Sequence, residues 1–99
     1  MILKVVNGKV ELRRETGSLV RVVCSRGGIA ARLNDDESLI LLTLEGGKVE
    51  LRRVTGSLVR VVVPKDAVNA YFSGKDLAIE LNNGKTQLRR ESGSLIRTI

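Results

Sequence analysis

Hydrophobic and polar residues alternate along most of this chain, in short segments that end at turns containing glycine. The alternation repeats every second residue, as expected for β-strands that bury one face and expose the other. The segment at residues 39–42 is apolar at every position, which is typical of a strand packed on both sides. The pattern predicts an all-β protein built from antiparallel strands.

One segment of this pattern occurs three times. Residues 7–23 and 46–62 are identical at 15 of 17 positions, and residues 83–99 match the first repeat at 11 of 17. Equivalent positions are separated by 39 and then 37 residues, without a helical pattern between them. Such a period predicts a repeated β supersecondary unit. We expect a single all-β domain over residues 1–99, divided into repeats at about 1–25, 26–64 and 65–99.

Each repeat contains two turn sequences that predict β-hairpins. The first is a pair of residues that tolerate positive φ, as a two-residue type I′ loop requires. These pairs are Asn7-Gly8, Gly46-Gly47 and Asn83-Gly84. The second is a three-residue loop that ends in glycine and closes a hairpin through a bulge. These loops are Glu15-Thr16-Gly17, Val54-Thr55-Gly56 and Glu91-Ser92-Gly93.

The predicted loops set the register of the strands. In the first repeat one face is expected to be apolar, and the opposite face to carry a row formed by Lys4, Glu11 and Arg21. The apolar face comprises Leu3, Val5, Val10, Leu12, Val20 and Val22. The same loop length places Thr43 beside Glu50 in the second repeat.

An additional strand is expected in the second and third repeats only. The predicted positions of this strand are residues 28–33 and 68–73. The first repeat starts at its second strand, so we expect eleven strands in groups of three, four and four.

The order of strands and turns resembles a β-propeller blade of the WD type. Residues 67–99 show the resemblance best, although the Gly-His and Trp-Asp signatures of WD repeats do not occur, because the chain has neither His nor Trp. Propellers contain typically four to eight blades, so the resemblance implies that chains associate, most simply as a dimer with a ring of blades. The competing fold is a compact threefold barrel or β-trefoil-like monomer.

Composition limits both the core and the chemistry. Of all residues 42% are hydrophobic but only 2% are aromatic, so the core is expected to consist of Val, Leu and Ile. The single cysteine, Cys24, excludes an intrachain disulfide and a cysteine-rich metal cluster. No apolar stretch is long enough for a signal peptide or a membrane-spanning helix. We expect a soluble cytoplasmic protein with no membrane partner, no cofactor and no metal.

Pairs of arginines at one position of each repeat are the most visible candidate site. The chain has 17 Lys and Arg against 11 Asp and Glu, and its formal net charge of +6 attracts anions. Repeated arginines can bind phosphate groups through charge-assisted hydrogen bonds. The alternative is a solvated strand edge that discourages aggregation. The candidate anion-binding residues are Arg13, Arg14, Arg52, Arg53, Arg89 and Arg90.

Three other features are better explained by local structure than by chemistry. The acidic cluster at residues 34–37 lacks the glycine and the ligand spacing of a calcium loop. Thr16, Thr55 and Ser92 follow arginine pairs, as in sites of basophilic kinases, but tight turns also require small polar residues. Cys24 aligns with an aliphatic residue of the second repeat, which indicates a packed thiol.

The sequence favours a non-enzymatic interaction or scaffold module that forms homo-oligomers. A catalytic Cys-His or Ser-His pair cannot be assembled, because the chain contains no His. The expected partner is another molecule of the same chain, with a protein or nucleic acid as a further partner. The alternative function is electrostatic binding of nucleic acid or another polyanion through the arginine clusters, with little stacking on aromatic side chains.

Overall fold

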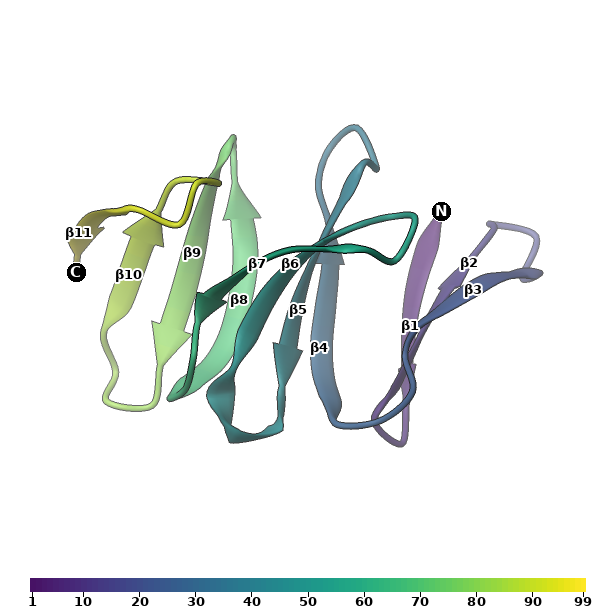
Figure 1. Ribbon diagram of the computed structural model, residues 1–99, viewed down its shortest axis with the longest axis horizontal. Coiled ribbons are helices and arrows are strands. Elements are labelled where there is room, and N and C mark those ends of the chain that lie inside the picture. Colours follow the sequence, from purple (N-terminus) through teal and green to yellow (C-terminus); the bar gives the residue numbers. More distant parts are fainter.

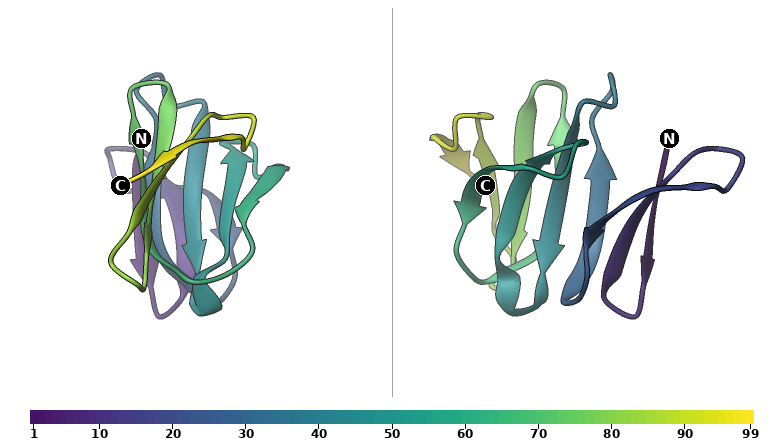
Figure 2. Two further views of the ribbon diagram at one scale, coloured as in Figure 1. Left: turned by 90° about the vertical axis from the view of Figure 1, so that its left-hand side faces the viewer. Right: turned by 45° about the vertical axis from the view of Figure 1, so that its right-hand side comes forward.

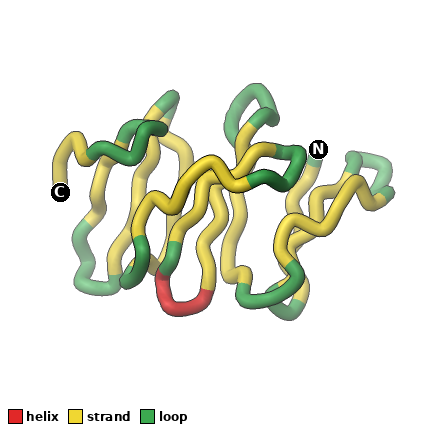
Figure 3. Tube along the Cα trace, in the orientation of Figure 1, coloured by secondary structure: helices red, strands yellow, loops and turns green.

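The computed structural model describes all residues from Met1 to Ile99, and these form three β-sheets. The first sheet contains β1 (Ile2–Val6), β2 (Lys9–Arg13) and β3 (Leu19–Cys24). The second contains β4 (Gly28–Leu33), β5 (Leu39–Leu44), β6 (Val49–Arg53) and β7 (Leu58–Val63). The third contains β8 (Ala67–Ser73), β9 (Asp76–Leu81), β10 (Thr86–Arg89) and β11 (Leu95–Thr98). A short 3-10 helix, η1 (Glu45–Gly47), forms the loop between β5 and β6 (Figure 3).

Each sheet is an antiparallel meander in which strands that follow one another in the sequence are neighbours. The predicted eleven strands in groups of three, four and four are confirmed, and β4 has the predicted bounds. Short loops favour this arrangement because they join strands only to adjacent positions. No strand pairing connects one sheet to another, so the alternative of a threefold barrel or β-trefoil-like chain is wrong.

The three sheets lie face to face in a row (Figure 1). The molecule measures 39 × 26 × 19 Å, and its termini lie at opposite ends of the row. The outermost strand of each sheet swings away from the strands before it (Figure 2), as the right-handed twist of β-sheets requires. The second sheet is therefore covered on both faces, whereas the first and third sheets each leave one face uncovered.

We call the face that each sheet directs towards the next sheet in the chain its forward face, and the opposite face its rear face. The forward faces carry Val10 and Leu12 in the first sheet, Val49 and Leu51 in the second, and Thr86 and Leu88 in the third. The rear faces carry Ile2 and Lys4 in the first sheet, Ile40 and Leu42 in the second, and Leu77 and Ile79 in the third.

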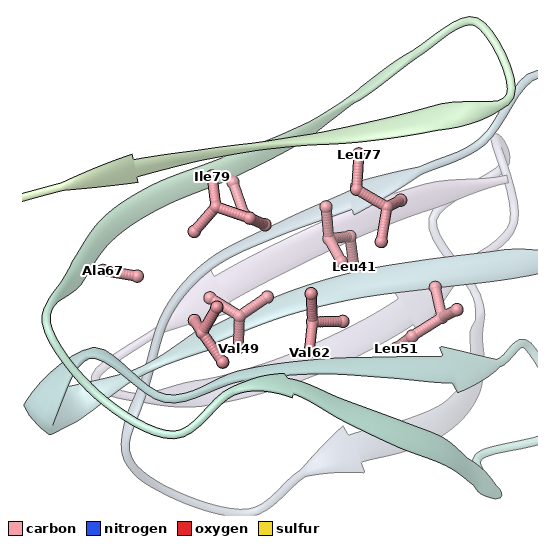
Figure 4. Close-up of a cluster of buried hydrophobic side chains, with 9 residues drawn as sticks. Leu41, Val49, Leu51, Val62, Ala67, Leu77 and Ile79 are labelled. Carbon is pink, nitrogen blue, oxygen red and sulfur yellow. The ribbon is translucent and has the colours of Figure 1, made fainter. Parts of the chain in front are cut away.

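Two clusters of buried side chains hold the row together. The cluster between the first and second sheets comprises Val10, Leu12, Val23, Ile40 and Leu42. The cluster between the second and third sheets comprises Leu41, Val49, Leu51, Val62, Val63, Ala67, Ala70, Leu77 and Ile79. In Figure 4, Leu77 and Ile79 face Val49 and Val62 across this second junction. Full burial of one such aliphatic side chain stabilises the fold by about 1.5–3 kcal/mol.

The register of the first hairpin agrees with the prediction only in the first repeat. There Val5 pairs with Val10 across the two-residue loop. In the second and third repeats the loop has three residues, because the amides of Leu44 and Leu81 donate to carbonyls four residues later. Thr43 consequently pairs with Val49, and its predicted pairing with Glu50 is wrong. One extra loop residue moves every side chain of the strand to the opposite face.

The register of the second hairpin departs from the prediction because of a bulge. Arg13 pairs with Leu19 as expected, but the register then shifts, and Arg21 pairs with Leu12. The predicted row of Lys4, Glu11 and Arg21 is therefore wrong at its last member. The bulge places Arg21 on the forward face, and equivalent bulges pair Arg60 with Leu51 and Arg97 with Leu88.

Candidate functional site

The first arginine of each predicted pair is held within its own sheet. The Arg13 Nε donates to Glu11 Oε1 at 3.0 Å, and Nη1 donates to the Gly17 carbonyl at 2.6 Å. Arg52 makes the same two bonds in the second sheet, at 2.9 and 2.8 Å. Arg89 makes them in the third sheet, where Gln87 replaces the glutamate. These side chains connect β2, β6 and β10 to the turns that follow them.

The glutamates that accept these bonds are almost completely buried. Glu11 is 6% exposed and Glu50 is 4% exposed, and a lysine lies within 3.1 Å of each carboxylate. Hydrogen bonds from Arg13 and Lys9 hold the pKa of Glu11 below its ordinary value. Burial raises the pKa of Glu50, but hydrogen bonds from its lysine and arginine outweigh burial, so this pKa is also lowered. Both carboxylates are therefore ionised parts of the framework.

The second arginine of each pair is exposed to solvent. Arg14 and Arg90 directly follow a strand, and Arg53 is the last residue of β6, so all three lie at the entrance to the second turn. Their backbone amides close the turn by donating to serine carbonyls four residues later, at 2.9 Å in all three repeats. Of the six candidate anion-binding residues, these three present their charge on the surface, whereas Arg13, Arg52 and Arg89 use theirs internally.

A different arginine of each repeat bridges neighbouring sheets. The Arg21 Nη1 on β3 donates to the carbonyl of Thr55 in the turn of the second sheet, at 2.8 Å. The Arg60 Nη1 on β7 donates in the same way to the carbonyl of Ser92 in the third sheet, at 2.9 Å. We call these contacts inter-sheet clips. The sequence pattern missed them, because the predicted register placed Arg21 beside Glu11 on the opposite face.

A groove of about 430 Å³ lies beside the second clip. It runs along the junction of the second and third sheets and is lined by Arg53, Arg60, Glu91 and Ser92, together with apolar side chains from the second sheet. The groove brings two arginines of one sheet against an acidic and a hydroxyl residue of the next. Opposite charges therefore face each other across this junction, next to the apolar cluster.

The remaining candidate features are local. The Asn34 side-chain oxygen accepts from the amides of Ser38 and Leu39, and the Asp36 carboxylate also accepts from Ser38, which lowers the pKa of Asp36. Cys24 is half-buried and donates to the carbonyl of Arg26. No cluster of three or more side chains suited to metal binding is present. The structure contains no helix with the length and hydropathy needed to cross a membrane.

The two outer faces of the row differ from the covered ones at equivalent positions. Val23 and Val62 are buried against the next sheet, with 8% and 7% exposed, whereas the equivalent Ile99 is 70% exposed. On the rear faces, Ile40 and Leu77 are fully buried, whereas the equivalent Ile2 is 48% exposed. The forward face of the third sheet and the rear face of the first sheet therefore expose apolar side chains that the inner junctions bury.

No protein-family model matches the chain, and no curated protein is similar to it.

Proposed function

We propose that this chain is a non-enzymatic interaction module that associates with itself. The forward face of the third sheet in one molecule would cover the rear face of the first sheet in another. This contact is heterologous, because different surfaces of the two molecules meet. In the simplest assembly two molecules make the contact twice and close a propeller-like ring of sheets, in which every sheet is covered on both faces.

The observation that supports this proposal is the exposure of Ile99, because the other two repeats bury a valine at the equivalent position. Removing one aliphatic side chain from water is worth about 1.5–3 kcal/mol, so a second molecule that covers Ile99 and Ile2 recovers burial that the inner junctions already have. The inner junctions support the proposal, since at each of them a forward face packs on the next rear face.

Sedimentation velocity and light scattering at increasing micromolar concentrations test this proposal. We expect a reversible rise in mass from the 10.8 kDa of one chain to twice that value. Substitution Ile99→Asp places a charge in the proposed contact and should shift the midpoint of association to higher concentration. The substitution Val22→Asp is the matched control, because Val22 is 44% exposed on the outer strand of the first sheet, and its equivalent Val61 remains 43% exposed beside an inner junction. A wild-type chain that stays monomeric throughout this range would contradict the proposal.

Binding of a polyanion is the second candidate function. Arg14, Arg53 and Arg90 support it, because they repeat at one position and expose their guanidinium groups. A triple change of these residues to Gln should abolish retention on heparin or single-stranded DNA at low salt. The equivalent change of Arg13, Arg52 and Arg89 cannot serve as control, because it would remove internal bonds. Exposed Lys65 and Lys75, changed to Gln, provide that control. Equal retention of the triple variant and the wild type would exclude this function for the arginine pairs.

A further inference from the structure

We infer that Arg97 of one molecule forms an inter-sheet clip with the carbonyl of Thr16 in a second molecule of this chain. The inference rests on the proposed self-association and specifies which groups recognise each other. It follows from a contact that the chain already makes at both of its inner junctions, where an arginine of the outermost strand reaches the turn of the next sheet.

The arginine that donates the hydrogen bond has the same position and register in all three sheets. Arg21, Arg60 and Arg97 occupy one position of the repeat, and each pairs across the sheet with a leucine on the forward face. The bulge before each of them gives the three side chains the same direction relative to their sheets. Arg21 and Arg60 find their acceptors within the chain, whereas Arg97 lies on the uncovered forward face and is exposed.

The acceptor is uncovered at the opposite end of the row. The turn glycines of the second and third sheets lie beneath the clip, since a Cβ at Gly56 would be 3.8 Å from Arg21 Cδ and one at Gly93 would be 3.5 Å from Arg60 Cδ. At Gly17, in the equivalent turn of the first sheet, no atom lies within 4 Å of such a Cβ. Gly17 and Thr16 are exposed, whereas Gly56 and Gly93 are half-buried. At one end of the row the Arg97 guanidinium lacks the acceptor that Arg21 and Arg60 have. At the other end the Thr16 carbonyl lacks the donor that Thr55 and Ser92 have.

One pair of positions on the two uncovered faces carries opposite charges. On the third sheet Glu80 occupies the forward-face position held by buried Thr43 in the second sheet, because both pair across the first hairpin in the same register. On the first sheet Lys4 occupies the rear-face position held by Ile79 in the third sheet. The inner junctions have uncharged residues at these positions. A contact between molecules that repeats the inner arrangement would bring the Glu80 carboxylate, which accepts from Asn69 within its own sheet, towards the Lys4 ammonium group. Such opposite charges favour this heterologous contact over contacts between identical faces.

The first experiment replaces the donor while keeping most of its apolar stem. Arg97→Met should raise the dissociation constant of the two-contact dimer by about a hundredfold or more, because each of its two contacts loses one charge-assisted hydrogen bond. Arg60→Met is the matched control, because the equivalent clip lies inside the chain. This control should lower the urea midpoint of unfolding and leave the dissociation constant of the folded protein unchanged.

The second experiment reverses the charges. Glu80→Lys and Lys4→Glu should each weaken self-association, and the double variant Glu80→Lys/Lys4→Glu should restore it, because opposite charges again face each other. Restoration by two changes at opposite ends of the row cannot come from a folding defect. Far-UV circular dichroism verifies the fold of each variant, and the Arg97→Met measurement stands on its own if a charge variant fails to fold.

The outcomes separate this inference from the proposed function. If the wild type associates but neither Arg97→Met nor the charge reversals change its dissociation constant, the inference is overturned while self-association stands. Pairing between the unpaired edges of β1 in two molecules is the competing route in that case. If the wild type is monomeric at every concentration, the proposed function and the inference both fail. Weakening by Arg97→Met together with rescue by the double charge variant supports the inference.

Discussion

Adjacent arginines of one repeat have different structural roles, although they are chemically identical. Arg52 points to the rear face, where it bonds the buried Glu50 and the Gly56 carbonyl, whereas Arg53 points to the forward face and is exposed. Alternation of side chains along a strand is the cause, because successive residues point to opposite faces. The same alternation places the clip residues on the forward face once a bulge has shifted their register.

The two neighbouring arginines should differ in their effect on stability. Arg52→Met removes a partner of the buried Glu50 and leaves the Gly56 carbonyl without its donor, so we expect the free energy of unfolding to fall by about 1–3 kcal/mol. Arg53→Met changes an exposed side chain and should alter this free energy by no more than about 0.5 kcal/mol. Urea denaturation of both variants measures the difference, and equal effects would contradict the assigned roles.

The buried glutamates should make stability depend on acid pH. The pKa values of Glu11 and Glu50 are lower in the folded protein than the ordinary value of 4.5. The unfolded chain therefore binds protons more readily, and this part of the stability is present above pH 4.5 and is lost as pH falls through the lowered pKa values. We expect the double variant Glu11→Gln/Glu50→Gln to lose less stability than the wild type between neutral pH and about pH 3.

The third repeat provides the reciprocal comparison for this pH dependence. It has Gln87 at the equivalent position, which accepts from Arg89 without carrying a charge. Gln87→Glu should add an acid-sensitive contribution and steepen the fall in stability. The urea midpoints of the wild type, the Glu11→Gln/Glu50→Gln variant and the Gln87→Glu variant measure this effect across the same pH range. Identical pH profiles for these three proteins would show that the carboxylates do not control acid unfolding.

At the scale of the elements, one loop residue decides which face of a strand is buried. The loop between β1 and β2 has two residues, but the corresponding loops of the second and third sheets have three. Loops of both lengths approach the next sheet, since the amide of Gly28 donates to the carbonyl of Gly8 at 2.8 Å and the amide of Asp66 donates to the carbonyl of Gly46 at 3.3 Å. A turn thus serves both as a hairpin connection and as a contact between sheets.

Equivalent glycines of two such loops should respond differently to substitution. Gly47 and Gly84 both have positive φ, of 88° and 87°, but a Cβ at Gly47 would overlap the backbone nitrogens of Asp66 and Ala67, whereas one at Gly84 would meet no atom within 4 Å. Gly84→Ala should cost about 1 kcal/mol through backbone strain alone. Gly47→Ala should cost about 3 kcal/mol, because it also forces neighbouring backbones apart. Thermal and urea denaturation measure both costs, and similar values would contradict the close approach.

At the scale of the whole molecule, a row of sheets cannot cover both of its ends. Each inner junction buries a forward face against a rear face, and the uncovered pair has the same two kinds of surface. A molecule of this design reaches full burial only when its ends meet another surface. These two uncovered faces are the physical basis of the proposed self-association.

Self-association should make the measured stability depend on protein concentration. A partner that binds the folded state alone stabilises it by mass action, so the thermal midpoint should rise with the concentration of the chain. The substitution Ile99→Asp should reduce this dependence, because Ile99 lies on the uncovered end of the row and is 70% exposed in the single chain. Thermal scans over about a hundredfold range of concentration provide the measurement. A constant midpoint would show that folding and association are not linked.

The sequence by itself determined the repeat, the number of strands, and the positions of the turns. These features depend on neighbours in the chain, since alternation, glycine and short polar loops act over a few residues. It also determined the register of the first hairpin, because Asn7 and Gly8 suit a two-residue loop. The anion-binding prediction for the six paired arginines stays a prediction, although the structure divides them into bonded and exposed sets.

Only the tertiary structure decided what the repeated residues contact. Bulges moved Arg21 and Arg60 onto the forward faces, and longer loops exchanged the faces of β5 and β9. A shift of one residue changes local energy little but reverses which side chains meet the next sheet, so packing between distant segments selects the register. The same packing separates Val23 and Val62 from Ile99, because identical positions of a repeat become different when only some of them have a neighbouring sheet.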